Sequence, residues 1–127
     1  MADNVEAVAS AFAALRQGDL SRFSPGYTHL GYDINGRPRI FDGLGPFVEM
    51  MAKCAQTFEV FAAEILSATA VDDELVLASV AVHRRTKAGL EYHGTIVMTF
   101  RVEDGIVTRG TDMVSSSGEA YWSSLGL

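Results

Sequence analysis

Asp33 is the residue whose type and position most directly suggest chemistry. It stands two residues before Asn35-Gly36, a dipeptide that favours a tight hairpin turn. A carboxylate beside a mostly apolar pocket can act as a general base, because burial raises its pKa towards neutral pH. The same carboxylate can instead bond to backbone groups of the turn, as Asp often does. Residue type and spacing leave both roles open.

Two amphipathic helices and a run of strands must position this residue. Apolar side chains recur at helical spacing along residues 5–15 and again along residues 47–58. Asp3 is suited to cap the first helix, and Gly18 is suited to end it. Between the two helices, residues 27–41 are expected to form two short extended segments joined by the turn.

The remainder of the chain predicts four antiparallel strands and a short terminal helix. Short turns separate the stretches of strand-forming residues, and such turns join antiparallel neighbours. The predicted strands are residues 60–71, 75–85, 90–102 and 106–115, followed by a helix at 117–125. Long strands twist, so a curved sheet wrapped over helices leaves a concavity in which pockets form. The order of elements therefore predicts an α+β architecture.

Side-chain alternation predicts which face of this sheet is buried. In the third long strand, Ile96, Met98 and Phe100 alternate with mostly polar residues, so their face belongs to the core. The second long strand, residues 75–85, is apolar on both faces over most of its length. Helices are expected to cover one face and a second subunit the other, which predicts a homodimer through the outer sheet face.

Composition excludes several classes of function. The 127 residues suit one domain, and a hydrophobic content of 48% supplies a packed core. The net charge of −6 opposes binding to nucleic acid and to anionic lipid. No apolar run approaches the roughly 20 residues of a membrane span, and residues 1–15 lack the basic segment of a secretory signal. We therefore expect a cytoplasmic protein that binds neither nucleic acid nor membrane.

Metal and cofactor chemistry find little support in the sequence. Cys54 is the only cysteine and fits a buried core thiol. His29, His83 and His93 lack tight ligand spacing, so we expect no metal site and no cofactor. His83 and His93 each share a strand face with an arginine, which favours the outer surface. His29 lies nearest to the expected pocket mouth.

Three short segments resemble the nuclear transport factor 2 superfamily, which includes ketosteroid isomerases and SnoaL-like polyketide cyclases. Residues 13–20 resemble the end of its first helix, residues 100–107 its last hairpin, and residues 119–122 the aromatic tail of SnoaL-like members. The resemblance covers residues 1–127 as a single domain. It implies a cystatin-like α+β cone with N-terminal helices packed on a strongly curved antiparallel sheet. Because this fold hosts enzymes, binding modules and assembly domains, it implies no single activity.

The resemblance also implies two catalytic candidates. Asp33 matches the position of the isomerase base, and Asp112 is the nearest match to the acidic residue near the last strand of the cyclases. If the even-numbered residues of 108–112 face the pocket, Asp112 can act there as acid and base together with Asp33. If the odd-numbered residues face it, Asp112 points away.

The two groups that stabilise the enolate in the isomerases are missing. Their places fall near Ala11 and Met98, which are apolar. Loss of one such donor commonly lowers the rate by about 10²–10³. A replacement must come from elsewhere in the pocket. The candidates are Tyr27, His29, Tyr32 and Arg109.

Two functions follow as alternatives. The first is a cofactor-independent isomerase, cyclase or lyase that transfers protons on a small apolar carbonyl compound. Its pocket would be lined by Phe47, Met50, Met51, Met98 and Phe100. The second is a non-catalytic small-ligand-binding or dimeric assembly domain of the same fold. It is motivated by the missing donors and by the strand that is apolar on both faces.

Overall fold

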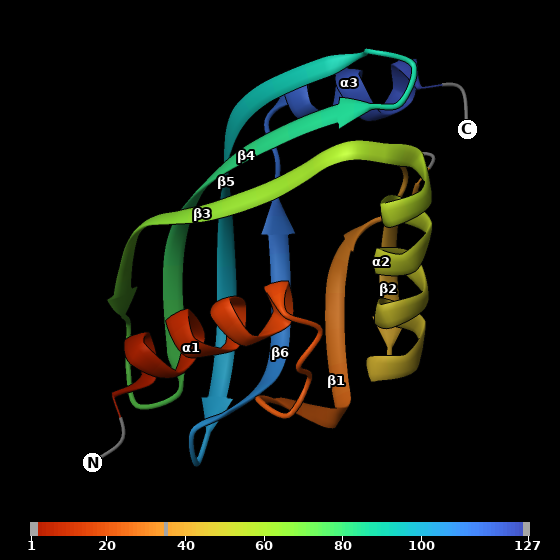
Figure 1. The fold of residues 1–127 in the computed structure, drawn as a ribbon. Coiled ribbons are helices and arrows are strands. Elements are labelled where there is room, and N and C mark those ends of the chain that lie inside the picture. The colour runs from red at the N-terminus through yellow and green to blue at the C-terminus, as the bar shows by residue number, and fades with distance from the viewer. Residues whose placement is uncertain (1–2, 35, 126–127) are drawn as a thin grey trace.

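The computed structural model describes residues 3–34 and 36–125 (Figure 1). In this part of the chain the elements are α1 (Asn4–Arg16), β1 (Phe23–Tyr32), β2 (Pro38–Asp42), α2 (Leu44–Thr57), β3 (Phe58–Ala70), β4 (Leu75–Thr86), β5 (Glu91–Glu103), β6 (Ile106–Met113) and α3 (Ser116–Ser124). The predicted succession of two helices, four strands and a terminal helix is confirmed. No helix within these two ranges is long and apolar enough to cross a membrane.

The six strands form one sheet in the order β2-β1-β6-β5-β4-β3. Strands β3 to β6 pair antiparallel in sequence order, as their short turns predicted. Strand β1 closes the sheet by pairing parallel to β6, and β2 pairs antiparallel to β1. The sheet curves around α1, and α2 packs along β1 and β2 (Figure 1). Helix α3 lies beside the start of β5.

The first helix forms as its sequence predicted. The Asp3 carboxylate accepts hydrogen bonds from the backbone N–H groups of Val5 and Glu6 at 3.0 and 3.3 Å. This cap satisfies donors that a helix start otherwise leaves without partners. Gly18 follows the helix with φ +77°, a conformation that glycine adopts without strain. The helix is therefore fixed at both ends across the concave face of the sheet.

The second helix begins at Leu44 and ends at Thr57. Met50 and Cys54 are buried, in agreement with the predicted apolar stripe and the predicted core thiol. Phe58 was predicted to close this stripe, but it is the first residue of β3, with ψ near 136°. The helical spacing is misleading there because Phe58 joins the same core cluster from an extended backbone.

The segment before α2 also differs from expectation. The two extended segments are confirmed as β1 and β2, with Tyr32 opposite Pro38. Strand β1 begins at Phe23, before the predicted start at residue 27, because Phe23 pairs with Val107 of β6 across an irregular register. The turn itself has the Asp33 carbonyl accepting the N–H of Gly36 at 2.9 Å. The predicted turn residue Asn35 lies outside the described residues.

The core lies on the concave face of the sheet. Ile96, Met98 and Phe100 of β5 are buried there, which confirms their predicted face, and Val76 and Val80 of β4 are buried beside them. The alternate residues of the same strands point to the convex outer face. The inner face, covered by helices, is the one that holds the cavity described next.

Candidate functional site

A cavity of about 160 Å³ lies between the concave face of the sheet and the three helices. Its wall is built mainly from aromatic and aliphatic side chains of α1, α2 and the inner strand faces. Polar side chains enter it at a few positions, namely His29, Tyr32, Arg84, Tyr92 and Asp112. For comparison, an apolar cavity of about 150 Å³ can hold benzene. The cavity therefore has room for at least one aromatic ring next to several polar groups.

Asp112, His29 and Tyr27 form a continuous chain of polar contacts at the wall of the cavity. Nε2 of His29 lies 3.0 Å from Oδ2 of Asp112, and Nδ1 of His29 lies 2.6 Å from the Tyr27 hydroxyl. Tyr27 and His29 are both buried. The second carboxylate oxygen of Asp112, Oδ1, is also buried and has no hydrogen-bond partner among the described residues.

The Asp112 carboxylate sets the direction of these hydrogen bonds, because it can only accept. It accepts the Nε2 proton of a neutral His29, and Nδ1 of His29 is then an acceptor. Burial, aided by the charge of Asp112, raises the pKa of Tyr27 far above its ordinary value of 10.0, so the phenol stays neutral and donates to Nδ1. These hydrogen bonds hold the Asp112 carboxylate through Oδ2 and leave Oδ1 available for another partner.

Two glycines allow these side chains to approach so closely. A Cβ atom on Gly110 would collide with the Tyr27 hydroxyl and would lie 3.0 Å from Nδ1 of His29. A Cβ atom on Gly31 would lie 2.8 Å from Oδ2 of Asp112. Both positions face the inner side of the parallel β1–β6 pair. Glycine at 31 and 110 is thus required by the contacts of the site.

Arg84 brings a positive charge to the same cavity. Its Nη1 donates to the carbonyl of Ala62 at 2.6 Å, and its guanidinium carbon lies 3.8 Å from the centre of the Phe61 ring. No ion pair joins Arg84 to a carboxylate within the described residues. Burial lowers the pKa of Arg84 from 12.5 to about 10, because desolvation penalises the charged form.

Sequence reasoning missed Arg84, although a signal was present. In β4, Val76, Ala78, Val80 and Val82 share one apolar face, and strict alternation continues that face to Arg84. An arginine at the end of a buried face is either a rim residue or a cavity residue. Here the cavity extends to that end of the strand.

The structure distributes the predicted pocket residues over three environments. Tyr32, Phe47, Met50, Met51 and Met98 line the cavity, as does His29. Tyr27 lies behind His29, and Phe100 is buried against the Phe12 ring with centroids 5.6 Å apart. Arg109 is exposed on β6 and does not belong to the lining. Of the four candidate oxyanion donors, only His29 and Tyr32 reach the cavity wall.

Asp112 and Asp33 are not brought together. Asp112 lines the cavity, so the even-numbered residues of 108–112 face inwards. Asp33 lines a separate, smaller pocket of about 100 Å³ that also contains Arg39, Glu49 and Lys53. Its Oδ1 accepts the backbone N–H of Arg37 at 3.1 Å across the turn. This geometry matches the turn-bonding role that the sequence had left open for Asp33.

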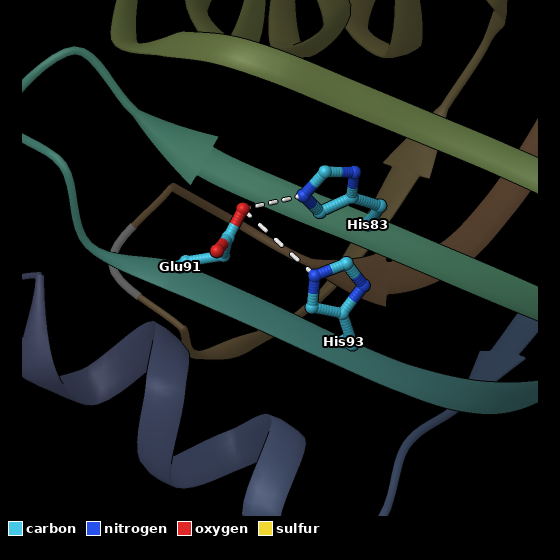
Figure 2. Close-up of side chains that lie close together, drawn as sticks. All are labelled: His83, Glu91 and His93. Atoms are coloured by element: carbon cyan, nitrogen blue, oxygen red, sulfur yellow. Dashed lines mark hydrogen bonds and ion pairs between the residues drawn. The ribbon is translucent and has the colours of Figure 1, made fainter.

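One cluster on the outer face has side chains that could hold a metal ion. His83 and His93 are directly opposed on β4 and β5, and their rings stack with centroids 4.0 Å apart. Glu91 lies beside both, with Oε2 at 2.7 and 3.8 Å from their Nε2 atoms (Figure 2). Arg85 binds the same Oε2 at 3.2 Å. The cluster was not visible from chain spacing, because it forms across two strands, and it points away from the cavity.

Comparison with known proteins identifies the fold. No model of a protein family matches the chain, and no curated protein matches it. A solved NTF2-like protein of unknown function from Burkholderia pseudomallei is similar at a TM-score of 0.78 and 14% identity, over 92% of this chain and 94% of that one. A putative SnoaL-like polyketide cyclase from a Jannaschia species is similar at 0.69 and 15%, over 87% and 83%.

A third solved structure extends the comparison to the isomerase group. It is a hypothetical protein with a ketosteroid isomerase-like fold from Catenulispora acidiphila, in complex with trimethylamine. The TM-score is 0.74 at 17% identity, over 96% of this chain and 92% of that one. The chain thus has the α+β cone fold of the NTF2-like, SnoaL-like and ketosteroid isomerase-like proteins.

Proposed function

We propose that the protein is a cofactor-independent isomerase, cyclase or lyase that transfers protons on a small apolar carbonyl compound. The observation that carries this proposal is the Asp112 carboxylate at the wall of a mostly apolar cavity. Its Oδ2 is held by His29, and its buried Oδ1 has no partner among the described residues. A buried acceptor without a partner is costly, which supports a ligand group as its natural partner.

The proposed chemistry begins with proton removal by Asp112. Oδ1 takes a proton from the carbon next to the carbonyl, the C–H bond breaks, and its electrons form an enolate. Return of the proton to another carbon gives an isomer. Attack of the enolate carbon on a second carbonyl of the same molecule forms a C–C bond and closes a ring, and the resulting alkoxide takes the proton back from Asp112. Tyr27 and His29 hold the carboxylate in one orientation throughout and serve as positioning residues.

Asp112 is preferred over Asp33 as the proton acceptor. Asp33 is committed to the turn through the N–H of Arg37 and lies outside the lining of the larger cavity. The similar structures support the choice of a small ligand. One is named as a putative polyketide cyclase, and another was solved with trimethylamine. These names belong to those proteins, and for this chain the activity is our proposal.

The proposal can be tested by hydrogen–deuterium exchange on a ketone that forms an enolate easily. We suggest 2-tetralone in D₂O, followed by proton NMR, because its fused rings suit an aromatic cavity. The protein should accelerate exchange next to the carbonyl. Asp112→Asn should lower that acceleration by about 10²–10⁴, the usual contribution of a general base. Full acceleration by a folded Asp112→Asn variant would overturn the proposal.

A homodimer through the outer sheet face is the second part of the proposal. Leu77, Val97 and Met113 are 44%, 37% and 64% exposed on neighbouring strands of that face. Val97 lies directly opposite Met113. A second copy could cover this apolar patch with its own, as in most two-fold dimers. The alternative function, a non-catalytic small-ligand-binding or dimeric assembly domain, would use the cavity for ligand binding or the same outer face for assembly. The cytoplasmic location stays a prediction from sequence.

A further inference from the structure

Arg84 is the one positively charged side chain among the described residues that line the cavity. Burial of a charge is unfavourable unless another group compensates it. The lowered pKa of Arg84 has this cause, since desolvation is its largest contribution. A charge kept in such a place without an ion-pair partner points to a ligand that supplies one.

The present contacts of Arg84 orient the guanidinium without neutralising it. The Ala62 carbonyl accepts from Nη1, and the Phe61 ring supports one face of the planar group. Asp112 lines the same cavity and attracts Arg84 over a distance, but no ion pair joins the two. Oδ2 of Asp112 is already bonded to His29. The cavity thus contains a carboxylate and a guanidinium that are held apart.

We propose that Arg84 binds a negatively charged oxygen of the ligand, so that the ligand is an aromatic or conjugated acid. The charged oxygen would belong to a carboxylate or to an ionised enol next to the carbonyl. A guanidinium can bind such oxygens through parallel hydrogen bonds, while aromatic walls accept the ring. This inference rests on the proposed function and narrows its substrate to acidic carbonyl compounds.

Arg84 would also supply a hydrogen-bond donor in place of the two missing enolate donors. When Asp112 removes a proton from carbon, negative charge grows on the conjugated oxygen. A guanidinium already placed at that oxygen stabilises the growing charge without further reorganisation. Arg84 would thereby take the role that Ala11 and Met98 cannot fill.

The test compares two probes of nearly equal shape, 2-naphthoate and its neutral amide, 2-naphthamide. Isothermal titration calorimetry should show that the protein binds the carboxylate at least about tenfold more tightly than the amide, as charge-assisted hydrogen bonds require. In Arg84→Met this preference should disappear, with amide affinity unchanged. Equal binding of both probes, no measurable binding of the carboxylate, or a preference that survives in Arg84→Met would each overturn the inference.

Three control variants keep the result interpretable. Arg85→Met removes the neighbouring arginine, which faces outwards and pairs with Glu59 and Glu91, and should leave the preference intact. Asp112→Asn leaves Arg84 in place and removes a negative charge from the same cavity, so the preference for the carboxylate should be at least as large. Arg84→Met keeps an aliphatic stem and removes a partly buried charge, so its melting temperature should not fall. Arg84→Lys should recover part of the preference if Arg84→Met has lost it.

The two proposals can fail separately. If tetralone exchange depends on Asp112 but the carboxylate preference is absent, the proposed function stands and the role of Arg84 is wrong. If the preference depends on Arg84 but no exchange occurs, the cavity binds an organic anion without proton transfer. The second result would favour the non-catalytic alternative.

Discussion

Nε2 of His29 lies 3.0 Å from Oδ2 of Asp112, although the two residues are 83 positions apart in the chain. The contact exists because β1 and β6 run parallel, side by side, in the middle of the sheet. It joins a buried imidazole to a carboxylate at the edge of an apolar cavity. The parallel pairing thus assembles the candidate site, and the predictions below follow from that arrangement.

The tautomer of His29 can be predicted from its two contacts. Tyr27 stays protonated because burial raises its pKa, and it donates to Nδ1 because Nε2 of the neutral imidazole donates its proton to Asp112. We expect nitrogen-15 NMR near neutral pH to show His29 with the proton on Nε2. Tyr27→Phe should remove this constraint and change the nitrogen shifts of His29, whereas Tyr32→Phe should not. A proton on Nδ1 in the unmodified protein would contradict the predicted hydrogen-bond chain.

The space beside the Tyr27 hydroxyl can be tested by adding a methyl group. Gly110→Ala should destabilise the protein by about 1–3 kcal/mol, because the new Cβ atom collides with the Tyr27 hydroxyl inside a packed core. Gly26→Ala is a matched control, since Gly26 is an exposed glycine of β1 and a Cβ there meets only Oγ of Ser24, at 3.9 Å. It should be neutral or stabilise the protein by up to about 1 kcal/mol. Urea denaturation measures both, and equal effects would be inconsistent with the packing described.

Asp72 should make stability depend on pH at the turn between β3 and β4. Its carboxylate accepts the N–H groups of Glu74 and Leu75 at 2.8 and 2.9 Å, and these bonds lower its pKa from 3.8. A lowered pKa means that the stabilisation is present above 3.8 and is lost as pH falls through the folded value. Asp72→Asn should therefore be less stable than the unmodified protein near pH 7.

The stability difference between Asp72→Asn and the unmodified protein should shrink as the pH falls below 3.8, because the carboxyl is protonated first in the unfolded chain and only at lower pH in the native protein. Asp73→Asn alters the adjacent carboxylate, for which the structure shows no such bonds, and should show a smaller difference. A gap that stays constant with pH in thermal melts would argue against the carboxylate as the source.

The proposed dimer predicts a change in mass after one substitution on the outer face. Met113→Lys places a charge within the apolar patch, opposite Val97, and should shift a dimer to monomer in sedimentation velocity. Ile40→Lys is a control, since Ile40 is exposed on β2, at the edge of the sheet and outside this patch. It should leave the mass unchanged. A monomeric unmodified protein at micromolar concentration would refute the dimer proposal.

Much of the fold was predictable because its signals are local. Asp3 caps α1 through its nearest neighbours in sequence, and short turns determine the order of β3 to β6. The early start of β1 at Phe23 was not predictable. Its partner, Val107, follows 84 residues later, and no local pattern announces a parallel pairing. At Phe58 the local pattern was misleading instead, because the helical spacing of apolar residues predicted a helical residue and the backbone there is extended.

The candidate site was only partly predictable for the same reason. The family resemblance pointed to Asp112 as a candidate. The face of the sheet on which Asp112 lies depends on the strand register, however, and a shift of one residue would move its side chain to the opposite face. The structure sets that register through the Met98–Asp112 pairing. Arg84 was overlooked because a charged side chain at a strand end usually reaches solvent. Its position next to Phe61 follows from the β3–β4 register, in which the two residues are directly opposed and which shifts at two irregular points.

The central claim is that Asp112, and not Asp33, transfers the proton. It is tested most directly by measuring tetralone deuterium exchange with Asp112→Asn and Asp33→Asn in parallel at equal concentrations of folded protein. Asp112→Asn should lose about 10²–10⁴ of the acceleration, while Asp33→Asn should stay within a few-fold of the unmodified protein. Loss of exchange in Asp33→Asn together with full exchange in Asp112→Asn would contradict the account.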